Sequence, residues 1–331
     1  MTASSTQLSS IFSRLSLGAM LVLSLTANCD EFVGPPEQAL PEDAANAFDT
    51  PRDYLSGQYL DFITSIDRFF GDERHYQEAN DSVMQLDITR VMGYGGEHKF
   101  VWSASANVRL PIAEQKLHLI LETDPDKKVI VDSKKIQSPQ LKQPASPQSY
   151  AAALRIEKIE AERWHYSADA GIKFAGLYSK PFARARARLA VPLELWRMTL
   201  AETAFWFNNT GVGATTQFDL ERPITDPLVF RSSSNATWLN DNQNFDLRQD
   251  FTFIHAWDER TALLYQASVI GVSRPQAQVS DYVLLVLYRY RLHREWTYLD
   301  LSPQLHFPRG NGYRASPMLS LRLEILFDQS R

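Results

Sequence analysis

From residue 82 to residue 327 the sequence alternates apolar and polar residues, in segments of mostly ten to fifteen residues. A period of two is that of a β-strand, whose successive side chains point to opposite faces. The stretch FARARARLAV, Phe182 to Val191, places its arginines on one such face and its alanines on the other. On a helix the same arginines would spread around the cylinder. The arginines are Arg184, Arg186 and Arg188. The pattern predicts an all-β chain.

Turn sequences such as NNTGVG, NDNQN and RGNGY divide the alternating region into strands. We expect fourteen strands, at 82–92, 97–110, 115–123, 149–160, 163–175, 181–192, 194–208, 213–222, 228–239, 245–257, 260–273, 279–293, 295–308 and 313–327. Pro303 and Pro317 fall inside the last two, where each removes a ladder hydrogen bond, so twelve strands is the alternative. The lysine- and proline-rich connection 124–148 is predicted to be a mobile surface loop.

The length of these strands indicates what surrounds them. Strands of soluble proteins cluster at about five to six residues, whereas a tilted strand that crosses a bilayer needs about nine to eleven. A closed sheet of about fourteen strands is also too wide for side chains to fill as a dry core. We therefore expect a transmembrane antiparallel up-and-down β-barrel, with the polar row lining the lumen and the apolar row facing lipid.

Aromatic residues are expected to mark the two rims of this barrel. The strand order places Trp164, Trp196, Trp257 and Trp296 at one rim, and it places Trp206, Trp238, Tyr282 and Tyr313 at the other. Two belts of amphipathic rings are typical of the two membrane interfaces.

The segment before the barrel divides into two parts. Residues 1–27 end in the apolar run LSLGAMLVLSLTA, which has the length and the small-residue ending of a secretory signal peptide. Residues 28–81 form an acidic leader, in which 30–81 carry thirteen Asp or Glu against three Arg. Apolar residues at helical spacing predict one amphipathic helix at about 53–70. The third part, 82–331, is the barrel.

Cys29 is the single cysteine of the sequence, so the exported chain can form no internal disulfide. The sequence LTANC around it also loosely resembles a bacterial lipobox, so lipidation of Cys29 is an alternative to simple cleavage of the signal peptide.

The last strand, SPMLSLRLEILF, alternates apolar residues and ends in an aromatic one. It resembles the C-terminal signal of Gram-negative outer-membrane β-barrels, carried here by Leu323, Ile325 and Phe327, although DQSR follows the final aromatic residue. The resemblance is to a class and not to one family. It implies location in the bacterial outer membrane, contact with membrane lipid and lipopolysaccharide, and recognition by the barrel-assembly machinery.

The polar row of the predicted strands defines the candidate functional residues, which line the lumen. It holds many arginines interleaved with carboxylates, and a ring of one sign would focus potential on anionic solutes. The principal candidates are Arg184, Arg186, Arg188, Arg109, Arg289 and Arg291. In each strand the residues alternate between the two faces, and we call a residue's place in this alternation its parity. The inward parity also includes these residues: Arg197, Arg231, Arg248, Arg314 and Arg322, with Asp87, Glu157, Asp169, Asp219, Glu221, Asp246, Asp250, Asp300 and Glu324. The alternative is that these charges pair across neighbouring strands and brace the barrel.

The acidic leader suggests a plug. We expect that the helix, with Asp53, Asp61 and Asp67, either enters the lumen and is held by the arginines, or stays outside and docks on a periplasmic partner.

Catalysis is not expected. His165, Ser167 and Asp169 have the residue types of a hydrolase triad, but along one strand they stand about 7 Å apart successively, too far for direct contact. The sequence shows no metal cluster, no nucleotide-binding loop and no basic nucleic-acid motif, so no cofactor is expected. A pore for small, anionic solutes is the leading hypothesis. An interaction barrel is second, and a lipid-acting outer-membrane enzyme is third.

Overall fold

The fourteen-strand all-β fold expected from the sequence is confirmed. The structure is a computed structural model that describes residues 69, 82–93, 96–109, 116–126, 148–160, 163–193, 195–225, 227–241, 243–292 and 296–328. The expected signal peptide, Cys29 and nearly all of the expected leader helix lie outside these residues. Phe69 is the described residue of that helix, and its backbone is helical. Among the described residues, no helix is long and apolar enough to cross a membrane.

The strands follow the predicted ranges to within a few residues. They are β1 (Val83–Gly93), β2 (Gly96–Arg109), β3 (Lys116–Thr123), β4 (Tyr150–Glu160), β5 (Trp164–Ala175), β6 (Tyr178–Leu193), β7 (Trp196–Phe207), β8 (Gly211–Thr225), β9 (Leu228–Leu239), β10 (Asn244–Ala256), β11 (Thr261–Val272), β12 (Gln278–Arg291), β13 (Thr297–Pro308) and β14 (Ser316–Asp328). A single-turn 3₁₀ helix, η1 (Arg309–Asn311), lies between β13 and β14.

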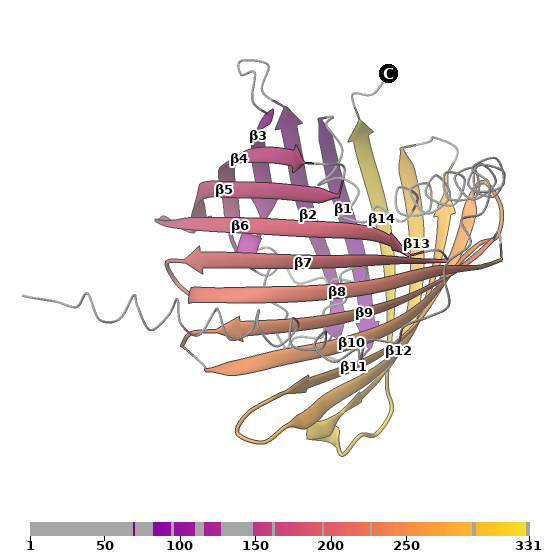
Figure 1. Ribbon diagram of the computed structural model, residues 1–331. Helices are drawn as coiled ribbons and strands as arrows, with labels where there is room; N and C mark the ends of the chain where they lie inside the picture. The colour runs from indigo at the N-terminus through magenta and orange to yellow at the C-terminus, as the bar shows by residue number, and fades with distance from the viewer. Residues whose placement is uncertain are drawn as a thin grey trace, which may run out of the picture. The chain divides into compact units, whose positions relative to one another are not determined.

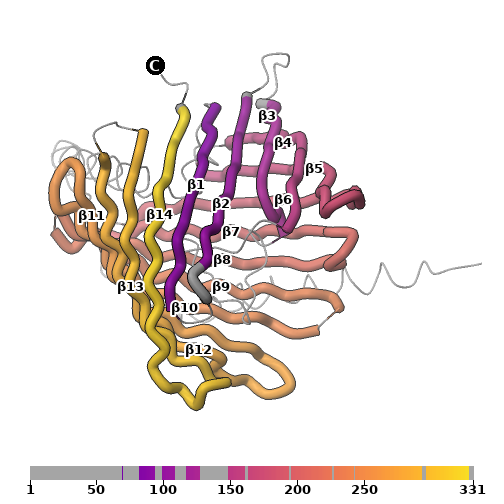
Figure 2. Tube along the Cα trace, turned by 180° about the vertical axis from the view of Figure 1, so that it is seen from behind, coloured from indigo at the N-terminus to yellow at the C-terminus, as the bar shows by residue number. Residues whose placement is uncertain are grey.

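Each strand pairs antiparallel with the next along the chain, and β1 pairs with β14 to close the barrel (Figure 1). Figure 2 shows β1 between β14 and β2. The closing register runs from Val83 opposite Asp328 to Gly93 opposite Met318. Closure leaves no strand edge unpaired, which is why a barrel needs no further element to cover it.

The alternative of twelve strands is wrong, because Pro303 and Pro317 interrupt their strands without ending them. Pro317 lies opposite Leu305 and Pro303 lies opposite Leu319 in the β13–β14 ladder. The β12–β13 ladder skips the pairs next to Pro303 and resumes at Tyr288 opposite Leu301. A missing N–H costs a local bond, and the flanking pairs hold the register.

Burial separates the two rows of side chains. In β9 buried and half-buried residues alternate without exception, and the buried row includes Arg231, Ser233, Asn235 and Thr237. In a closed barrel the row that faces the interior is the buried one, so we call it inward and the other row outward. The outward row carries exposed large apolar residues such as Phe251.

The expectation that the inward row is polar throughout is wrong in two places. On β9–β12 inward apolar side chains form a lumenal apolar strip, consisting of Val229, Ile254, Ala262, Leu264, Ile270, Val283, Leu285 and Leu287. On β3–β9 a second group forms a distal apolar band, consisting of Ile120, Ala151, Ala153, Phe182, Phe205, Phe207 and Leu239. A run of five apolar residues, Val283 to Leu287, breaks the alternation in the sequence because both faces of β12 are apolar there.

The distal apolar band is continuous across β8 because a glycine leaves room for an aromatic ring. Gly213 lies between Phe205 and Leu239 in the sheet register. A Cβ at Gly213 would come within 2.4 Å of the Phe205 ring. Glycine is thus required by the close approach of a side chain and not by a turn.

The base of the long 124–148 connection is held against the inward face, which corrects its interpretation as a mobile surface loop at that end. Asp124 is buried, and its carboxylate accepts hydrogen bonds from the Gln148 backbone N–H at 3.1 Å and the Ser149 hydroxyl at 2.7 Å. The Asp126 carboxylate lies 2.7 Å from Nζ of the inward Lys173. Both ends of the connection are therefore tied together at the barrel wall.

Short turns complete the rims. At the β10–β11 turn the Arg260 backbone N–H donates to the Asp258 carboxylate at 2.7 Å, and this bond lowers the pKa of Asp258 below its usual value. At the end of β14, Phe327 stacks on Trp296, with ring centroids 6.2 Å apart. On the opposite rim Tyr282 and Tyr313 lie 5.8 Å apart.

Candidate functional site

The inward charges gather into networks that cross several strands. We name the first, on β3–β6, the ladder network and the second, around the β1–β14 closure, the seam network. The ladder network consists of Glu122, Arg155, Glu157, Asp169 and Arg184. The seam network consists of Arg289, Asp300, Arg322 and Glu324, with Asp87 joined to Glu324 through the Gln85 amide.

The ladder network is built on direct cross-strand neighbours. Arg155, Asp169 and Arg184 lie opposite one another on β4, β5 and β6. Arg155 donates from Nε and Nη2 to the two oxygens of Asp169 at 2.7 and 3.0 Å, and Arg184 donates to the same carboxylate from the other side. Arg184 also reaches Glu122 on β3, at 2.8 Å. One carboxylate is thus shared by two guanidinium groups.

The other arginines of the FARARARLAV stretch share the inward row of β6. Arg188 is buried and Arg186 is half-buried. At the end of β4, Glu157 lies 3.6 Å from Arg155 and 3.8 Å from the imidazole of His165. The guanidinium row is thus interleaved with carboxylates from neighbouring strands.

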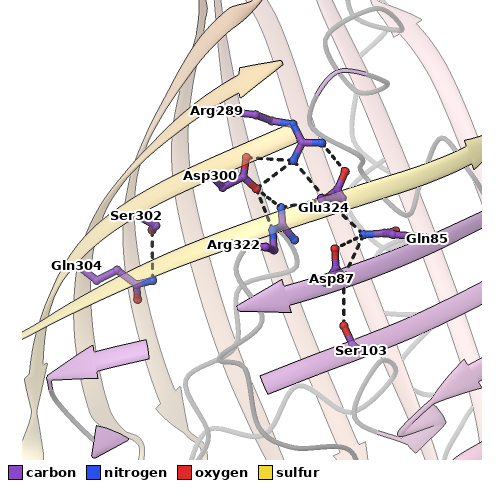
Figure 3. Close-up of polar contacts among 9 residues, drawn as sticks. All are labelled: Gln85, Asp87, Ser103, Arg289, Asp300, Ser302, Gln304, Arg322 and Glu324. Atoms are coloured by element: carbon purple, nitrogen blue, oxygen red, sulfur yellow. Dashed lines mark hydrogen bonds and ion pairs between the residues drawn. The ribbon is translucent and has the colours of Figure 1, made fainter. Parts of the chain in front are cut away.

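The seam network has the same kinds of group in a tighter arrangement (Figure 3). Arg289 lies 3.0 Å from Asp300 and also pairs with Glu324. Arg322 lies 3.2 Å from Glu324 and donates from Nε to Asp300 at 2.8 Å. The Arg289 and Glu324 side chains are fully buried. Two arginines and two carboxylates therefore form a closed ring of contacts.

Residues of β1 and β2 extend this ring across the closure of the barrel. The Gln85 amide donates to Asp87 at 3.1 Å and to Glu324 at 3.4 Å. The Ser103 hydroxyl on β2 donates to Asp87 at 3.1 Å. Polar contacts thus run from β12 through β14 to β2 without a break.

Aromatic rings cover Arg289 of the seam network. The guanidinium carbon lies 4.1 Å from the Tyr298 ring centroid and 6.0 Å from that of Phe69. The Phe69 and Tyr298 rings meet edge to face, with centroids 5.5 Å apart. Phe69 also packs against the lumenal apolar strip. A residue of the acidic leader therefore lies against the inward wall.

Further inward pairs lie on β7–β10. Arg231 pairs with Glu221, and Arg197 lies 3.9 Å from the same carboxylate. Arg248 Nε lies 2.8 Å from Asp250. Arginine and carboxylate alternate here as they do in the two larger networks, so the positive charge of this wall is balanced locally.

Described inward charges pair across strands, as in the alternative expected from the sequence. Arg184 and Arg289 each contact two carboxylates. Arg314 was expected inside but lies exposed in the turn before β14, so that assignment is wrong. Arg291 is half-buried at the end of β12. Arg109 is the last residue of β2, and the structure describes its backbone only.

Two residues of the ladder network were missed by the parity reading of the sequence. Arg155 has the parity of Glu157 on the same strand, so the signal was present. Glu122 stands one residue before the end of β3, where parity is least secure. Its contact with Arg184 joins β3 to β6. These two strands do not pair with each other, so no strand register predicts the contact.

No hydrolase geometry appears among the described inward residues. Asp169 of the expected trio is engaged by Arg155 and Arg184, while His165 lies beside Glu157. His306, fully buried, contacts Asp281 at 3.4 Å and the Gln304 amide oxygen at 3.1 Å. Within the part of the chain that the structure describes, no group of His, Cys, Asp and Glu could hold a metal ion.

No protein-family model matches the sequence, and no curated protein matches it either. Among solved structures, OprB of Pseudomonas putida is similar at a TM-score of 0.47 and 9% identity, over 78% of this chain and 97% of that one. The outer-membrane channel DcaP of Acinetobacter baumannii is similar at 0.44 and 7%, over 75% and 96%. The KdgM porin, in complex with disordered oligogalacturonate, is similar at 0.37 and 7%, over 73% and 99%. At this level of similarity we draw no conclusion from them about function.

Proposed function

We propose that the protein is a β-barrel of the bacterial outer membrane that forms a channel for small solutes and is held closed at rest by its leader. The observation that carries the proposal is a closed fourteen-strand barrel with ion-paired groups on its inward face and large apolar residues on most of its outward face. A soluble barrel would have the reverse polarity.

The outward face supports placement in a membrane. Its side chains include Phe251, Leu284 and Leu301, which are 44%, 50% and 41% exposed. Aromatic pairs such as Trp296 with Phe327 lie where strands end. An exposed apolar band between aromatic rims is what a bilayer stabilises.

Phe69 supports closure by the leader. A water-filled lumen would hydrate the lumenal apolar strip at a cost of about 25 cal/mol for each Å² exposed. Phe69 covers part of this strip and meets Tyr298 and Arg289. We therefore propose that the leader docks by its apolar face, and that its carboxylates Asp53, Asp61 and Asp67 play a smaller part than the sequence suggested.

The paired arginines lead us to propose that size, more than charge, selects the solute. Arg184 is neutralised by Glu122 and Asp169. A balanced wall creates no strong field of one sign. We therefore expect the form lacking residues 30–81 to show little preference for anions, and neutralising Arg184, Arg186 and Arg188 together should move its selectivity toward cations because their carboxylate neighbours are uncovered.

Single-channel conductance in a planar bilayer tests the proposal. The refolded mature chain is compared with a form lacking residues 30–81 and with Phe69→Ala. We expect small or rare currents from the full chain, steady current from the deletion, and more frequent opening with Phe69→Ala. Phe251→Ala, an outward phenylalanine, is the matched control and should behave like the full chain.

Folding is checked by heat-modifiable gel mobility in every sample. Steady current of equal size with and without the leader would disprove closure by the leader. Silence from folded protein of both forms would disprove the channel and favour a braced barrel that serves periplasmic partners.

A further inference from the structure

The outward face of β6–β10 differs from the rest of the outward wall. Half-way along β7, the outward residue is Glu202, which is exposed. Its neighbours in the register are Ala187 on β6 and Thr216 on β8, and Thr216 lies opposite Ala236 on β9. One row below, Ser234 lies opposite Gln249. Polar groups therefore occupy the middle of four adjacent strands.

These polar side chains are hydrogen-bonded to one another along the surface. The Thr216 hydroxyl donates to the Glu202 carboxylate at 2.6 Å. The Gln249 amide donates to the Ser232 hydroxyl at 3.0 Å, and the Ser234 hydroxyl donates to the Gln249 amide oxygen at 2.5 Å. The carboxylate accepts one bond here and has room for several, so the cluster is built but not saturated.

Small residues flank the polar cluster on β6–β8, while the large apolar residues Phe218, Leu247 and Phe251 lie opposite the small and polar residues of β9. Ala185 lies opposite Ala204, and Ala204 lies opposite Ala214. We name the whole surface the small-polar face, and it consists of Ala183, Ala185, Ala187, Glu202, Ala204, Ala214, Thr216, Ser232, Ser234, Ala236 and Gln249. Ala183, Ala185 and Ala187 are the outward alanines of the FARARARLAV stretch. Short side chains let another surface approach the backbone closely, as at helix contacts within membranes.

This step rests on the proposed location in a membrane. There, contact between the small-polar face and lipid is unfavourable. A carboxylate, an amide and three hydroxyls at mid-height find no partners among acyl chains. Across the barrel the middle residues of the outward row are Leu284, Leu301 and Leu321, all exposed and apolar. Arg90 on β1 is an outward charge opposite Leu321, and its guanidinium lies over the Phe100 ring, whereas the polar groups of the small-polar face are hydrogen-bonded to one another as a cluster.

We propose that the small-polar face is the contact surface between two copies of this chain in the membrane. Five strands about 4.8 Å apart and about six residues of each at about 3.3 Å give about 480 Å² per copy. The two copies would bury about 1,000 Å² in total, the lower bound for a specific interface.

A second copy also supplies matching chemistry. Glu202 offers acceptor oxygens, while the Ser232 hydroxyl, which accepts from Gln249, has its own O–H to donate on the same face. In a two-fold contact both copies use the same surface, so each of these groups occurs twice in the interface, once from each copy. Lipid tails offer no donor, so they leave Glu202 as unsatisfied as before.

Cross-linking in lipid vesicles tests the proposal on the full mature chain with Cys29→Ser. Ala236→Cys lies in the small-polar face, and Ala106→Cys on β2 is the matched outward control. Copper phenanthroline oxidation is expected to convert most of Ala236→Cys to a dimer and little of Ala106→Cys. Equal cross-linking of the two variants, or none in either, would overturn the proposal.

The strength of association is measured by energy transfer between labelled copies as lipid dilutes them. Glu202→Leu combined with Gln249→Leu should weaken dimerisation at least tenfold while leaving the barrel folded, since both changes suit a lipid-facing surface. Ala204→Trp should also weaken it, and Ala106→Trp should not. Unchanged association in the double variant would overturn the proposal.

Insertion and conductance of the same samples separate this inference from the proposed function. Monomers that insert and conduct would refute the two-copy contact alone. Failure of folded protein to enter lipid would refute both. Cross-linking of Ala236→Cys in cells to a different protein, without a dimer, would also refute the two-copy contact.

Discussion

The ladder and seam networks have the same composition, two arginines and three carboxylates, but they differ in depth and in the strands they join. In the seam network Arg289 and Glu324 are fully buried and Arg322 is 21% exposed, whereas both arginines of the ladder network, Arg155 and Arg184, are 8% and 9% exposed. The ladder network lies on consecutive strands β3–β6. The seam network links β1 with β12–β14, and its Gln85–Glu324 hydrogen bond spans 239 residues of sequence.

This difference shows that the same chemistry serves two purposes according to chain topology. A contact between consecutive strands closes a short loop, so a modest energy suffices to hold it. The seam can form only when both ends of the barrel are present, and it must hold the last strand against the first. The most deeply buried ion pairs lie where closure is entropically most demanding.

The largest expected effect comes from Arg289→Met. It leaves Asp300 and Glu324 buried with one arginine instead of two, and breaking a buried pair costs about 3–5 kcal/mol. Urea titration of the barrel in lipid vesicles, followed by gel mobility, measures the loss. Adding Glu324→Leu removes the orphaned charge and should restore most of the stability. A loss below about 1 kcal/mol for the single variant would show that the seam network does not hold the closure.

A smaller effect is expected from Arg184→Met. Arg155 still holds Asp169, so the variant chiefly removes the ion pair between Arg184 and Glu122, at about 1–3 kcal/mol. The same titration measures it. In the form lacking residues 30–81, selectivity should move toward cations because a carboxylate is uncovered. A loss equal to that of Arg289→Met would remove the distinction between the networks.

The smallest effect concerns the aromatic rings beside each network. Tyr298 lies 4.1 Å from Arg289, while Phe182 lies 5.8 Å from Arg184. Double-mutant cycles with Tyr298→Leu and with Phe182→Leu isolate each pair from the packing of the ring itself. We expect about 1 kcal/mol of coupling for the seam pair and less than half of that for the ladder pair. A larger coupling energy for the ladder pair than for the seam pair would contradict the idea that burial strengthens the contact between arginine and ring.

The alternation of residues predicted which side chains share a face, but not which of them meet. Arg184 and Asp169 belong to the inward row because of their parity, and the register places them opposite each other. Parity also identified Arg289, Arg322 and Glu324 as inward. It could not show that their charges cancel, since cancellation depends on distances of a few ångströms between strands.

Two segments depart from the simple alternation of apolar and polar residues. A reading that only assigns alternate residues to the two faces overlooks both. The apolar run Val283–Leu287 marks a strand that is apolar on both faces, and its inward half forms part of the lumenal apolar strip. Glu202 interrupts an outward apolar row, and it lies at the centre of the small-polar face. The first exception marks the surface that Phe69 contacts, and the second marks the proposed contact between two copies.

The sequence by itself determined the strands, their approximate ends and the two faces of each, because a period of two follows from local backbone geometry. It also indicated a membrane barrel, since strand length and an outward apolar row are properties of single segments. Only the tertiary structure decided which charges pair, that Glu122 reaches Arg184 across two strands, and that Phe69 lies against Arg289. These contacts depend on strand register and on barrel curvature, which arise from the whole closed sheet and from no segment alone.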